Sequence, residues 1–195
     1  METVFSTALG NGSASPASPA ARVESTEEPG WLGAARQGEP WALEQLYHAH
    51  QPQIYALCFR LLQRQDDAED AVQATFVRAF RALPRFRGQS RVRTWLYRIA
   101  TNEALSMLRR RREGADWQEE RHGTADATGG VVERMAVRAA LGRLTPDHRA
   151  ILVLRLWEEL SYEEIAAVLG ISLPAVKMRL NRAREQFRKY YEEGQ

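Results

Sequence analysis

Apolar residues recur at intervals of three and four along most of this chain, which is the spacing of one buried face on an α-helix. Such sets predict a helix opened by Glu39 and Pro40, a second opened by Pro52, and a third that begins at Asp66, with a fourth from Thr94 onward. Their inward residues are, in order, Trp41, Leu43, Leu46 and Tyr47; Ile54, Leu57, Cys58, Leu61 and Leu62; Ala68, Val72, Phe76, Val77 and Phe80; and Trp95, Leu96, Ile99, Ala100, Leu105 and Leu108. The sequence carries no alternating strand pattern longer than a few residues, so it predicts an all-α fold.

Two stretches lack this apolar pattern. Residues 1–30 are rich in Ser, Ala, Pro and Gly and predict a disordered tail. Residues 114–130 hold Gly, Ala, Asp and Thr without helical spacing and predict a linker. We therefore expect two small helical domains, at residues 31–113 and 131–195, joined by a flexible segment.

The segment 161–184 predicts a helix-turn-helix. Ser161 and Glu164 have the spacing of a capping box, and Gly170 can end that helix in the left-handed region. Ser172 can cap the next helix, and Pro174 fits its first turn. The apolar face of this second helix is formed by Val176, Leu180, Ala183 and Phe187. A solvated basic face on a surface helix would show the same charge run, but the capped two-helix unit favours DNA binding.

Charge is strongly segregated, although the net charge is only +2. The stretch from Arg78 to Arg112 carries eleven Arg against one acid, Glu103. It is either a solvated face or a surface for single-stranded nucleic acid, in which arginines hold the backbone and bases meet aromatic groups. For such base contacts the candidates are Phe86, Tyr97 and Asn102, whereas Trp95, Leu96 and Ile99 are expected in the core. An acidic cluster precedes this stretch, and it suits either a helix N-terminus or a face that meets a basic protein; its members are Asp66, Asp67, Glu69 and Asp70.

Composition excludes several classes of protein. The single cysteine, Cys58, lies in an apolar run and is expected to be a core residue, so neither a disulfide framework nor a cysteine metal cluster is possible. His48 and His50 make no wider metal-ligand pattern, and the acidic cluster lacks support elsewhere as a magnesium site. Paired catalytic carboxylates, a nucleophile with a histidine and a phosphate-binding glycine loop are all missing from the sequence, so we expect no enzyme, cofactor or metal. An apolar run of membrane-spanning length and a signal peptide are also missing, which predicts a cytoplasmic protein.

Together these segments resemble the extracytoplasmic-function (ECF) sigma factors of bacterial RNA polymerase. The resemblance is carried by DAEDAVQATFVRAFRAL from Asp67, by FRGQSRVRTWLYRIATNEALSMLRRRR from Phe86, and by SYEEIAAVLGIS and VKMRLNRAR in the segment 161–184. The first two motifs resemble region two of the family and the last resembles region four. The resemblance covers residues 31–192 and implies a transcription initiation factor that binds core polymerase, reads the −10 and −35 promoter elements and helps to open the duplex.

The resemblance also implies roles for particular residues. The helix from Asp67 would dock on the clamp helices of the largest polymerase subunit, with contacts from Asp66, Asp67, Glu69, Asp70, Gln73 and Phe76. The −10 element would be met by Phe86, Arg87, Arg91, Arg93, Tyr97, Arg98 and Asn102, with Asn102 at the position that lines a pocket for a flipped-out base. The −35 element would be met by Pro174, Ala175, Lys177, Met178, Arg179, Asn181 and Arg182. The linker would thread through the polymerase, and an anti-sigma factor would be a further partner.

This chain departs from the family pattern in its recognition helix. Pro174 and Ala175 stand where many members have Gly-Thr, and Met178 stands where a small polar residue is common. An apolar contact, for example to a thymine methyl group, would therefore replace a hydrogen bond, and the promoter preference would differ. The main alternative is an ordinary helix-turn-helix regulator that binds duplex DNA as a dimer, but such a protein would not need the arginine-rich block.

Overall fold

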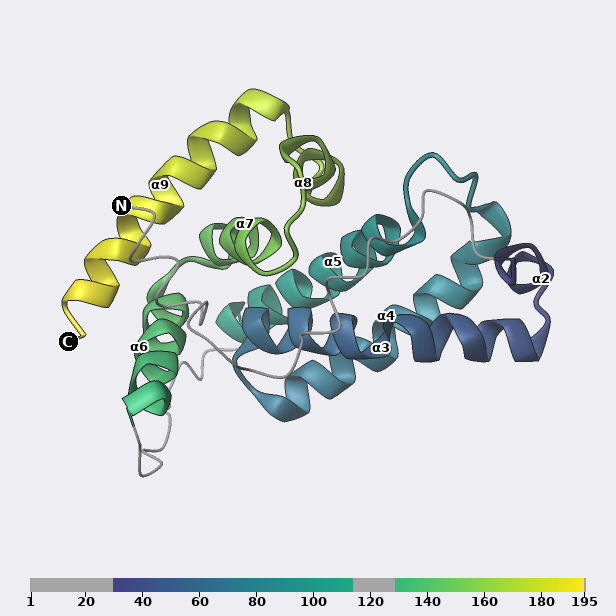
Figure 1. Ribbon diagram of the computed structural model, residues 1–195, viewed down its shortest axis with the longest axis horizontal. Coiled ribbons are helices and arrows are strands. Elements are labelled where there is room, and N and C mark those ends of the chain that lie inside the picture. The colour runs from purple at the N-terminus through teal and green to yellow at the C-terminus, as the bar shows by residue number, and fades with distance from the viewer. Residues whose placement is uncertain (1–29, 114–128, 195) are drawn as a thin grey trace.

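The computed structural model describes residues 30–113 and 129–194, and within these ranges its regular structure is entirely helical (Figure 1). The expectation of an all-α fold is therefore confirmed. The expected tail and most of the expected linker lie outside the described residues.

The first group of helices corresponds to the arginine-rich half of the sequence. It consists of α2 (Leu32–Arg36), α3 (Pro40–Leu62), α4 (Gln65–Ala82), the short 3-10 helix η2 (Leu83–Arg85) and α5 (Val92–Glu113). Helices α3, α4 and α5 pack on one another. Gln63, which follows α3, takes a left-handed conformation with φ of 63°, and this turns the chain directly into α4.

One boundary prediction in this group is wrong. Pro52 was expected to open a new helix, but it lies inside α3, which runs unbroken through it. Proline removes one N–H donor from the helix, but Leu46 before it and Ile54 and Leu57 after it are buried in the same core. Burial of both halves therefore outweighs the local preference for a helix start at Pro52, whose own side chain is exposed.

The second group of helices carries the predicted helix-turn-helix. It consists of α6 (Gly129–Arg143), α7 (Pro146–Leu156), α8 (Tyr162–Leu169) and α9 (Leu173–Glu192). Thr145 caps α7 by accepting a hydrogen bond from the His148 N–H, with Pro146 in the first turn. Helix α9 lies across α6, α7 and α8 and forms the outer edge of the molecule (Figure 1).

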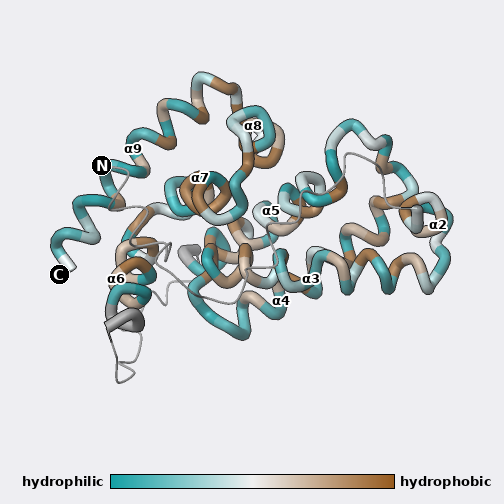
Figure 2. The backbone as a smooth tube through the Cα atoms, viewed as in Figure 1, coloured by the Kyte–Doolittle hydropathy of each residue, from teal (hydrophilic) through white to brown (hydrophobic). Residues whose placement is uncertain are grey.

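The two groups share one continuous core rather than standing apart. Helix α5 lies against α8 and α7, and α3 also contacts α7. Figure 2 shows α7 as one of the most hydrophobic elements, placed between α9 and α5. Fully buried residues from both groups form one cluster, which includes Leu57 and Leu96 of the first group and Leu154 and Leu160 of the second. The prediction of two helical units thus holds, but the sequence did not indicate that they would bury apolar surface against each other.

Candidate nucleic-acid and protein interfaces

The helix-turn-helix is built from the capping residues that the sequence predicts. Ser161 Oγ accepts the Glu164 N–H at 3.1 Å, and Glu164 Oε2 accepts the Ser161 N–H at 2.9 Å, so the capping box is complete. Gly170 ends α8 with φ of 66°, and Ser172 Oγ accepts the Ala175 N–H at 3.4 Å to cap α9. These two caps fix the short turn, and the turn fixes how α9 projects from α8.

Helix α9 buries one face and presents the opposite one to solvent. Its buried residues are Val176, Leu180, Ala183 and Phe187, as the spacing predicts. The predicted DNA-contacting residues that lie exposed are Pro174, Lys177, Met178, Asn181 and Arg182. Ala175 and Arg179 are half-buried, and Arg179 Nη1 lies 4.0 Å from Asp147 Oδ1. Met178 is 52% exposed although it is apolar, so α9 offers one hydrophobic contact among hydrogen-bonding and cationic groups.

The first half of α5 and the loop before it hold the other predicted nucleic-acid contacts. Exposed members of this set are Arg87, Arg91, Arg98 and Asn102. Phe86 is 9% exposed, packs on Trp95 with ring centroids 4.9 Å apart, and is covered by the Arg36 guanidinium. Tyr97 is 1% exposed. The two aromatic candidates are therefore not open stacking surfaces in this arrangement, whereas the basic candidates and Asn102 are accessible.

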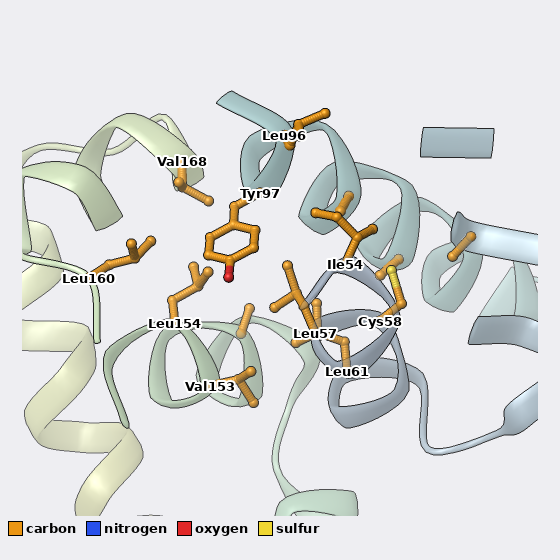
Figure 3. Close-up of a cluster of buried hydrophobic side chains, with 14 of the residues drawn as sticks. Ile54, Leu57, Cys58, Leu61, Leu96, Tyr97, Val153, Leu154, Leu160 and Val168 are labelled. Atoms are coloured by element: carbon orange, nitrogen blue, oxygen red, sulfur yellow. The ribbon is translucent and has the colours of Figure 1, made fainter. Parts of the chain in front are cut away.

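Tyr97 is buried between the two groups of helices, among apolar side chains from both (Figure 3), and its hydroxyl takes part in a polar junction. Its hydroxyl donates to Glu158 Oε2 at 2.5 Å, and Arg60 Nη1 lies 3.2 Å from Glu158 Oε1. The Arg93 guanidinium lies over the Tyr97 ring and reaches the Glu158 carbonyl oxygen at 3.5 Å. Burial raises the pKa of Glu158 above its ordinary value, against the opposing effects of the Tyr97 hydrogen bond and of Arg60. Burial also lowers the pKa of Arg60, and Glu158 opposes that shift.

Further polar contacts join the groups on either side of this junction. Thr94 Oγ1 donates to Glu164 Oε1 at 3.2 Å, which ties the beginning of α5 to the capping box of α8. Arg138 of α6 donates to Gln63 twice, to the carbonyl oxygen at 2.6 Å and to Oε1 at 3.1 Å. Sequence reasoning did not single out Glu158 or these pairings, because residues 61 to 98 positions apart leave no local pattern in the chain.

Arg149 is a buried cation of the interface, with 7% of its surface exposed. Its guanidinium donates to the carbonyl oxygens of Leu141, Gly142 and Leu144 near the end of α6, and to that of Leu61 near the end of α3. Burial lowers the pKa of Arg149 to about 10. The last carbonyls of a helix carry partial negative charge, so one arginine stabilises two helix ends that belong to different groups.

The acidic beginning of α4 forms a separate surface. Asp66, Glu69, Asp70 and Gln73 are exposed. Asp67 is instead half-buried, and its Oδ2 lies 2.8 Å from Arg111 Nη1 and 3.6 Å from Arg64 Nε. Phe76 is 3% exposed and packs on Tyr47, with ring centroids 4.7 Å apart. Of the residues predicted to bind the polymerase, four are thus open to a partner, one is engaged within the chain and one is buried.

One apolar side chain further along α4 is also exposed and extends this surface, and another is exposed at the beginning of α3. Val77 is 48% exposed and Trp41 is 55% exposed, although the helical spacing placed both on inward faces. On both helices, the face that the spacing of apolar residues predicts as inward is therefore wider than the face that is buried. A protein partner at α4 would therefore meet carboxylates and apolar groups together.

The described residues 30–113 and 129–194 contain no cluster of three or more His, Cys, Asp or Glu side chains that could hold a metal ion. His48 lies 3.6 Å from Glu44, one turn earlier on α3, while His50 is buried against Trp31. The two histidines therefore do not converge. None of the helices in the described part of the chain is long and apolar enough to span a bilayer.

Two models of protein families match the chain, one in each group of helices. Sigma-70 region 2 matches residues 46–113, and Sigma-70, region 4 matches residues 134–187. The first match covers α4 and α5 with most of α3, and the second covers most of α6 to α9. The arginine-rich unit and the helix-turn-helix unit thus correspond to two regions of one family, in the order that the sequence motifs indicate.

Curated relatives are similar over most of this chain. The ECF RNA polymerase sigma factor SigE of Mycolicibacterium smegmatis is 38% identical over 156 residues, which are 75% of this chain and 60% of that protein. The RNA polymerase sigma factor YlaC of Bacillus subtilis is 35% identical over 158 residues, which are 76% of this chain and 91% of YlaC.

Two solved structures have a similar fold. The sigma factor RpoE of Bartonella quintana, in complex with the anti-sigma factor NepR, aligns with a TM-score of 0.65 and 29% identity over 76% of this chain and 96% of that one. CnrH, in complex with the cytosolic domain of CnrY, aligns with a TM-score of 0.65 and 28% identity over 84% of this chain and 96% of CnrH.

Proposed function

The chain belongs to the ECF sigma factors, the initiation subunits of bacterial RNA polymerase, and on that premise we propose that it directs core polymerase to promoters by gripping DNA at two places. The observation that carries this proposal is the pairing of two unlike surfaces in one chain. Helix α9 offers an exposed basic face for duplex DNA, and α5 with its preceding loop offers an arginine-rich surface suited to a separated strand. An ordinary helix-turn-helix regulator needs the first surface alone.

Recognition of the −35 element is assigned to α9. Lys177, Asn181 and Arg182 are exposed on one face and supply donors for base edges and phosphates. Met178 supplies an apolar contact that suits a thymine methyl group. Pro174 lies exposed and Ala175 and Arg179 lie half-buried near the same face, where they complete the contact set.

Recognition of the −10 element is assigned to α5 and its preceding loop. Arg87, Arg91 and Arg98 are exposed and suit the phosphates of a separated strand, and Asn102 lies exposed on α5, one turn beyond Arg98, where it can meet an extruded base. Phe86, Arg93 and Tyr97 belong to the same proposed set. Phe86 and Tyr97 are buried in the present arrangement, so their contacts with DNA require this surface to be uncovered.

Core polymerase is proposed to dock on α4. Asp66, Glu69, Asp70 and Gln73 form an exposed polar surface that suits basic groups of a partner, and Val77 adds an apolar contact. Asp67 and Phe76 support this surface from within, Asp67 by holding Arg111 and Phe76 by packing under it.

Further partners and location follow from this role. Two similar proteins of known structure are held by a second protein, an anti-sigma factor in one case, and we propose an anti-sigma partner for this chain as well. The chain would work in the cytoplasm, where polymerase and chromosome are, and would act by binding and not as a catalyst in its own right.

The test of this function is transcription in vitro with purified core polymerase on a library of genomic fragments. Addition of the protein should produce transcripts from discrete start sites that share −10 and −35 sequences. Absence of stimulation by folded protein would exclude the proposed function. Sequence-specific binding to duplex DNA without any effect on polymerase would instead favour the ordinary regulator.

The docking surface has its own test. Asp66→Lys with Asp70→Lys reverses two exposed charges and spares the ion pair between Asp67 and Arg111. We expect core affinity to fall at least about tenfold. The control is Glu185→Lys with Glu192→Lys, which makes the same charge change at exposed positions of α9. Equal core affinity for the wild type and both variants would remove the docking role from α4.

A further inference from the structure

The arginine-rich stretch from Arg78 to Arg112 contains one acidic residue, and that residue is buried. Glu103 lies on α5 directly after Asn102, and its side chain is only 5% exposed. Its cationic partner comes from α4, where Arg78 Nη1 lies 2.8 Å from Glu103 Oε1. A buried carboxylate is costly unless a cation or a hydrogen-bond donor reaches it, so Arg78 stabilises Glu103 in this position.

Arg78 is more exposed than this ion pair requires. Its side chain is 65% exposed, and the atom that meets Glu103 is only one of the two terminal nitrogens of the guanidinium. A guanidinium carries five N–H donors in a flat fork, so a group held at one nitrogen still offers donors to a second anion. Anchoring also reduces the side-chain entropy that such a contact would otherwise cost. Arg78 is thus a cation that is already oriented and still open to solvent.

Arg78 projects from a different side of α4 than the surface proposed for polymerase. Asp70 and Val77 are exposed and lie two turns apart on that surface. Arg78 follows Val77, and one residue turns an α-helix by about 100°. The ion pair with Glu103 shows that this turn carries Arg78 toward α5. Polymerase can therefore dock along Asp70 and Val77 without covering the outer edge of the Arg78 guanidinium.

On α5, Glu103 lies beside the row of residues proposed for the −10 strand. Arg98 and Asn102 are exposed one turn apart and define that row. Glu103 is about 100° further around the helix, on the side that faces α4. The Arg78 guanidinium held there borders the row from the α4 side. A strand with a base at Asn102 runs its phosphates along a border of this row, and Arg78 places a fixed cation at the border with α4.

From these positions, and on the basis of the proposed function, we propose that Arg78 contacts a phosphate of the separated strand beside Asn102, and that Glu103 is the residue that positions it. Phosphates are the same at every step of a strand, so this contact carries no sequence information of its own. It fixes the register of the strand instead. Arg78 therefore sets which base reaches Asn102, whereas Asn102 reads that base.

The test separates a phosphate contact from the simpler role of neutralising Glu103. Arg78→Ala combined with Glu103→Gln removes the whole ion pair, so it leaves the net charge unchanged and no carboxylate buried without its partner. Binding is measured by fluorescence anisotropy with the full chain and a labelled pool of random single-stranded DNA of about 12 nucleotides, because phosphate contacts do not depend on sequence. We expect the double variant to lose about fivefold in affinity at about 50 mM salt, and its plot of log affinity against log salt to be shallower by about 0.7.

A matched control makes the same two changes at another ion pair. Arg143→Ala with Glu193→Gln removes an exposed pair at 2.6 Å in the second unit, and we expect it to keep the wild-type affinity and slope. Wild-type binding by the Arg78 double variant would show that Arg78 only neutralises Glu103 and would overturn the contact. An equal loss in both double variants, or no binding of the pool by the wild-type chain, would overturn it as well. Circular dichroism should show wild-type helix content for each form.

The positioning role of Glu103 has a separate measurement. Glu103→Asp keeps every charge but shortens the anchor by one methylene, which draws the guanidinium away from the strand, so we expect about threefold weaker binding of the pool. The same change in the Arg78→Ala background should have no further effect on binding. Unchanged affinity of Glu103→Asp would overturn the positioning role. These assays contain no polymerase, so a chain that binds the pool through Arg78 but fails to direct transcription would overturn the proposed function and keep the contact with single-stranded DNA.

Discussion

The two surfaces that we propose for DNA binding differ in how far their contact residues are exposed. Helix α9 carries its contact residues on an exposed face, fixed by caps within its own unit. Helix α5 carries basic residues on the outside but keeps Tyr97 beneath the second unit, where Glu158 accepts its hydroxyl hydrogen bond. Most of the residues proposed to read the −35 element are therefore accessible in this structure, whereas Tyr97 and Phe86 of the set proposed for the −10 element are covered.

This difference follows from the chemistry of the two targets. Reading the edges of paired bases in a groove needs a rigid helix with polar side chains, which tolerate water between encounters. Holding separated bases needs aromatic rings and pockets, and such groups are apolar surfaces that favour burial when DNA is absent. The second unit provides that burial for Tyr97, whereas Phe86 is buried against Trp95 of its own unit.

We expect the largest effect from a change at Arg149, which joins the two groups of helices that carry the two surfaces. Arg149→Met removes donors from four carbonyl oxygens at the ends of α3 and α6 and leaves them buried. We expect the free energy of unfolding, measured by urea titration, to fall by about 3 kcal/mol. Arg143→Met, at an exposed arginine, should cost less than about 1 kcal/mol. Equal losses would mean that the carbonyls near Arg149 find other donors.

The next prediction concerns DNA binding by α9 alone. Arg182→Ala should weaken binding to DNA carrying the −35 element by about 1–3 kcal/mol if Arg182 reads a base edge, and the loss should be confined to one position of the element. Lys189→Ala, two turns further along the same helix, serves as the control. An equal loss of affinity for every DNA sequence would indicate instead that Arg182 contacts a phosphate.

The pH dependence of the free energy of unfolding tests whether water reaches the core around Cys58. Burial is the largest cause that raises the pKa of Cys58 from 9.0 to about 12, and the Glu103 and Glu158 carboxylates add to it. The unfolded thiol ionises above pH 9 while the native thiol stays protonated, so its contribution is present below pH 9 and is lost progressively as the pH rises toward 12. At pH 10 the loss is about 1.4 kcal/mol.

The Cys58→Ala variant shows whether the thiol causes this loss. Its free energy of unfolding should fall between pH 8 and pH 10 by about 1.4 kcal/mol less than that of the wild type, because the other titrating groups are common to both proteins. Parallel pH profiles would mean that water reaches Cys58 in the native state.

The smallest expected change in stability concerns the loop between α7 and α8. Glu159 has φ of 55°, in the left-handed region that residues with a side chain disfavour. Its carboxylate also repels the neighbouring carboxylate of Glu158. Glu159→Gly should raise the free energy of unfolding by about 0.5 kcal/mol, as measured in urea. Gln63→Gly makes the same change at φ of 63°, but it also deletes an acceptor for Arg138 and should not stabilise. A gain at both positions would show that backbone strain outweighs the side-chain contacts.

Sequence patterns predicted those parts of the molecule whose causes are local. The capping residues Ser161, Gly170 and Ser172 act within a few positions of themselves, and all three behave as expected. The spacing of Val176, Leu180 and Phe187 likewise defines the buried face of α9. Pro52 shows the limit of local rules, because packing on both sides of it keeps α3 continuous.

The interface between the units could not be predicted in this way. Glu158 and Glu159 are adjacent acids in a loop, and nothing in their own neighbourhood indicates that one is buried against Tyr97 and the other exposed. Arg149 similarly reads as one arginine among many, although its donors meet two helix ends. For the site residues, the sequence indicated the chemistry of Phe86 and Tyr97 but not their burial. Phe86 packs on Trp95 beneath the Arg36 guanidinium, and Tyr97 is covered by a unit more than fifty residues away.

The capping box of α8 carries one further consequence. Glu164 uses one carboxylate oxygen for the Ser161 N–H and the other for the Thr94 hydroxyl. The contact with Ser161 lies within the second unit, so the cap that starts α8 does not depend on the contact with Thr94. One glutamate therefore both caps a helix and joins the two units, and the geometry of the helix-turn-helix is set without help from the first unit.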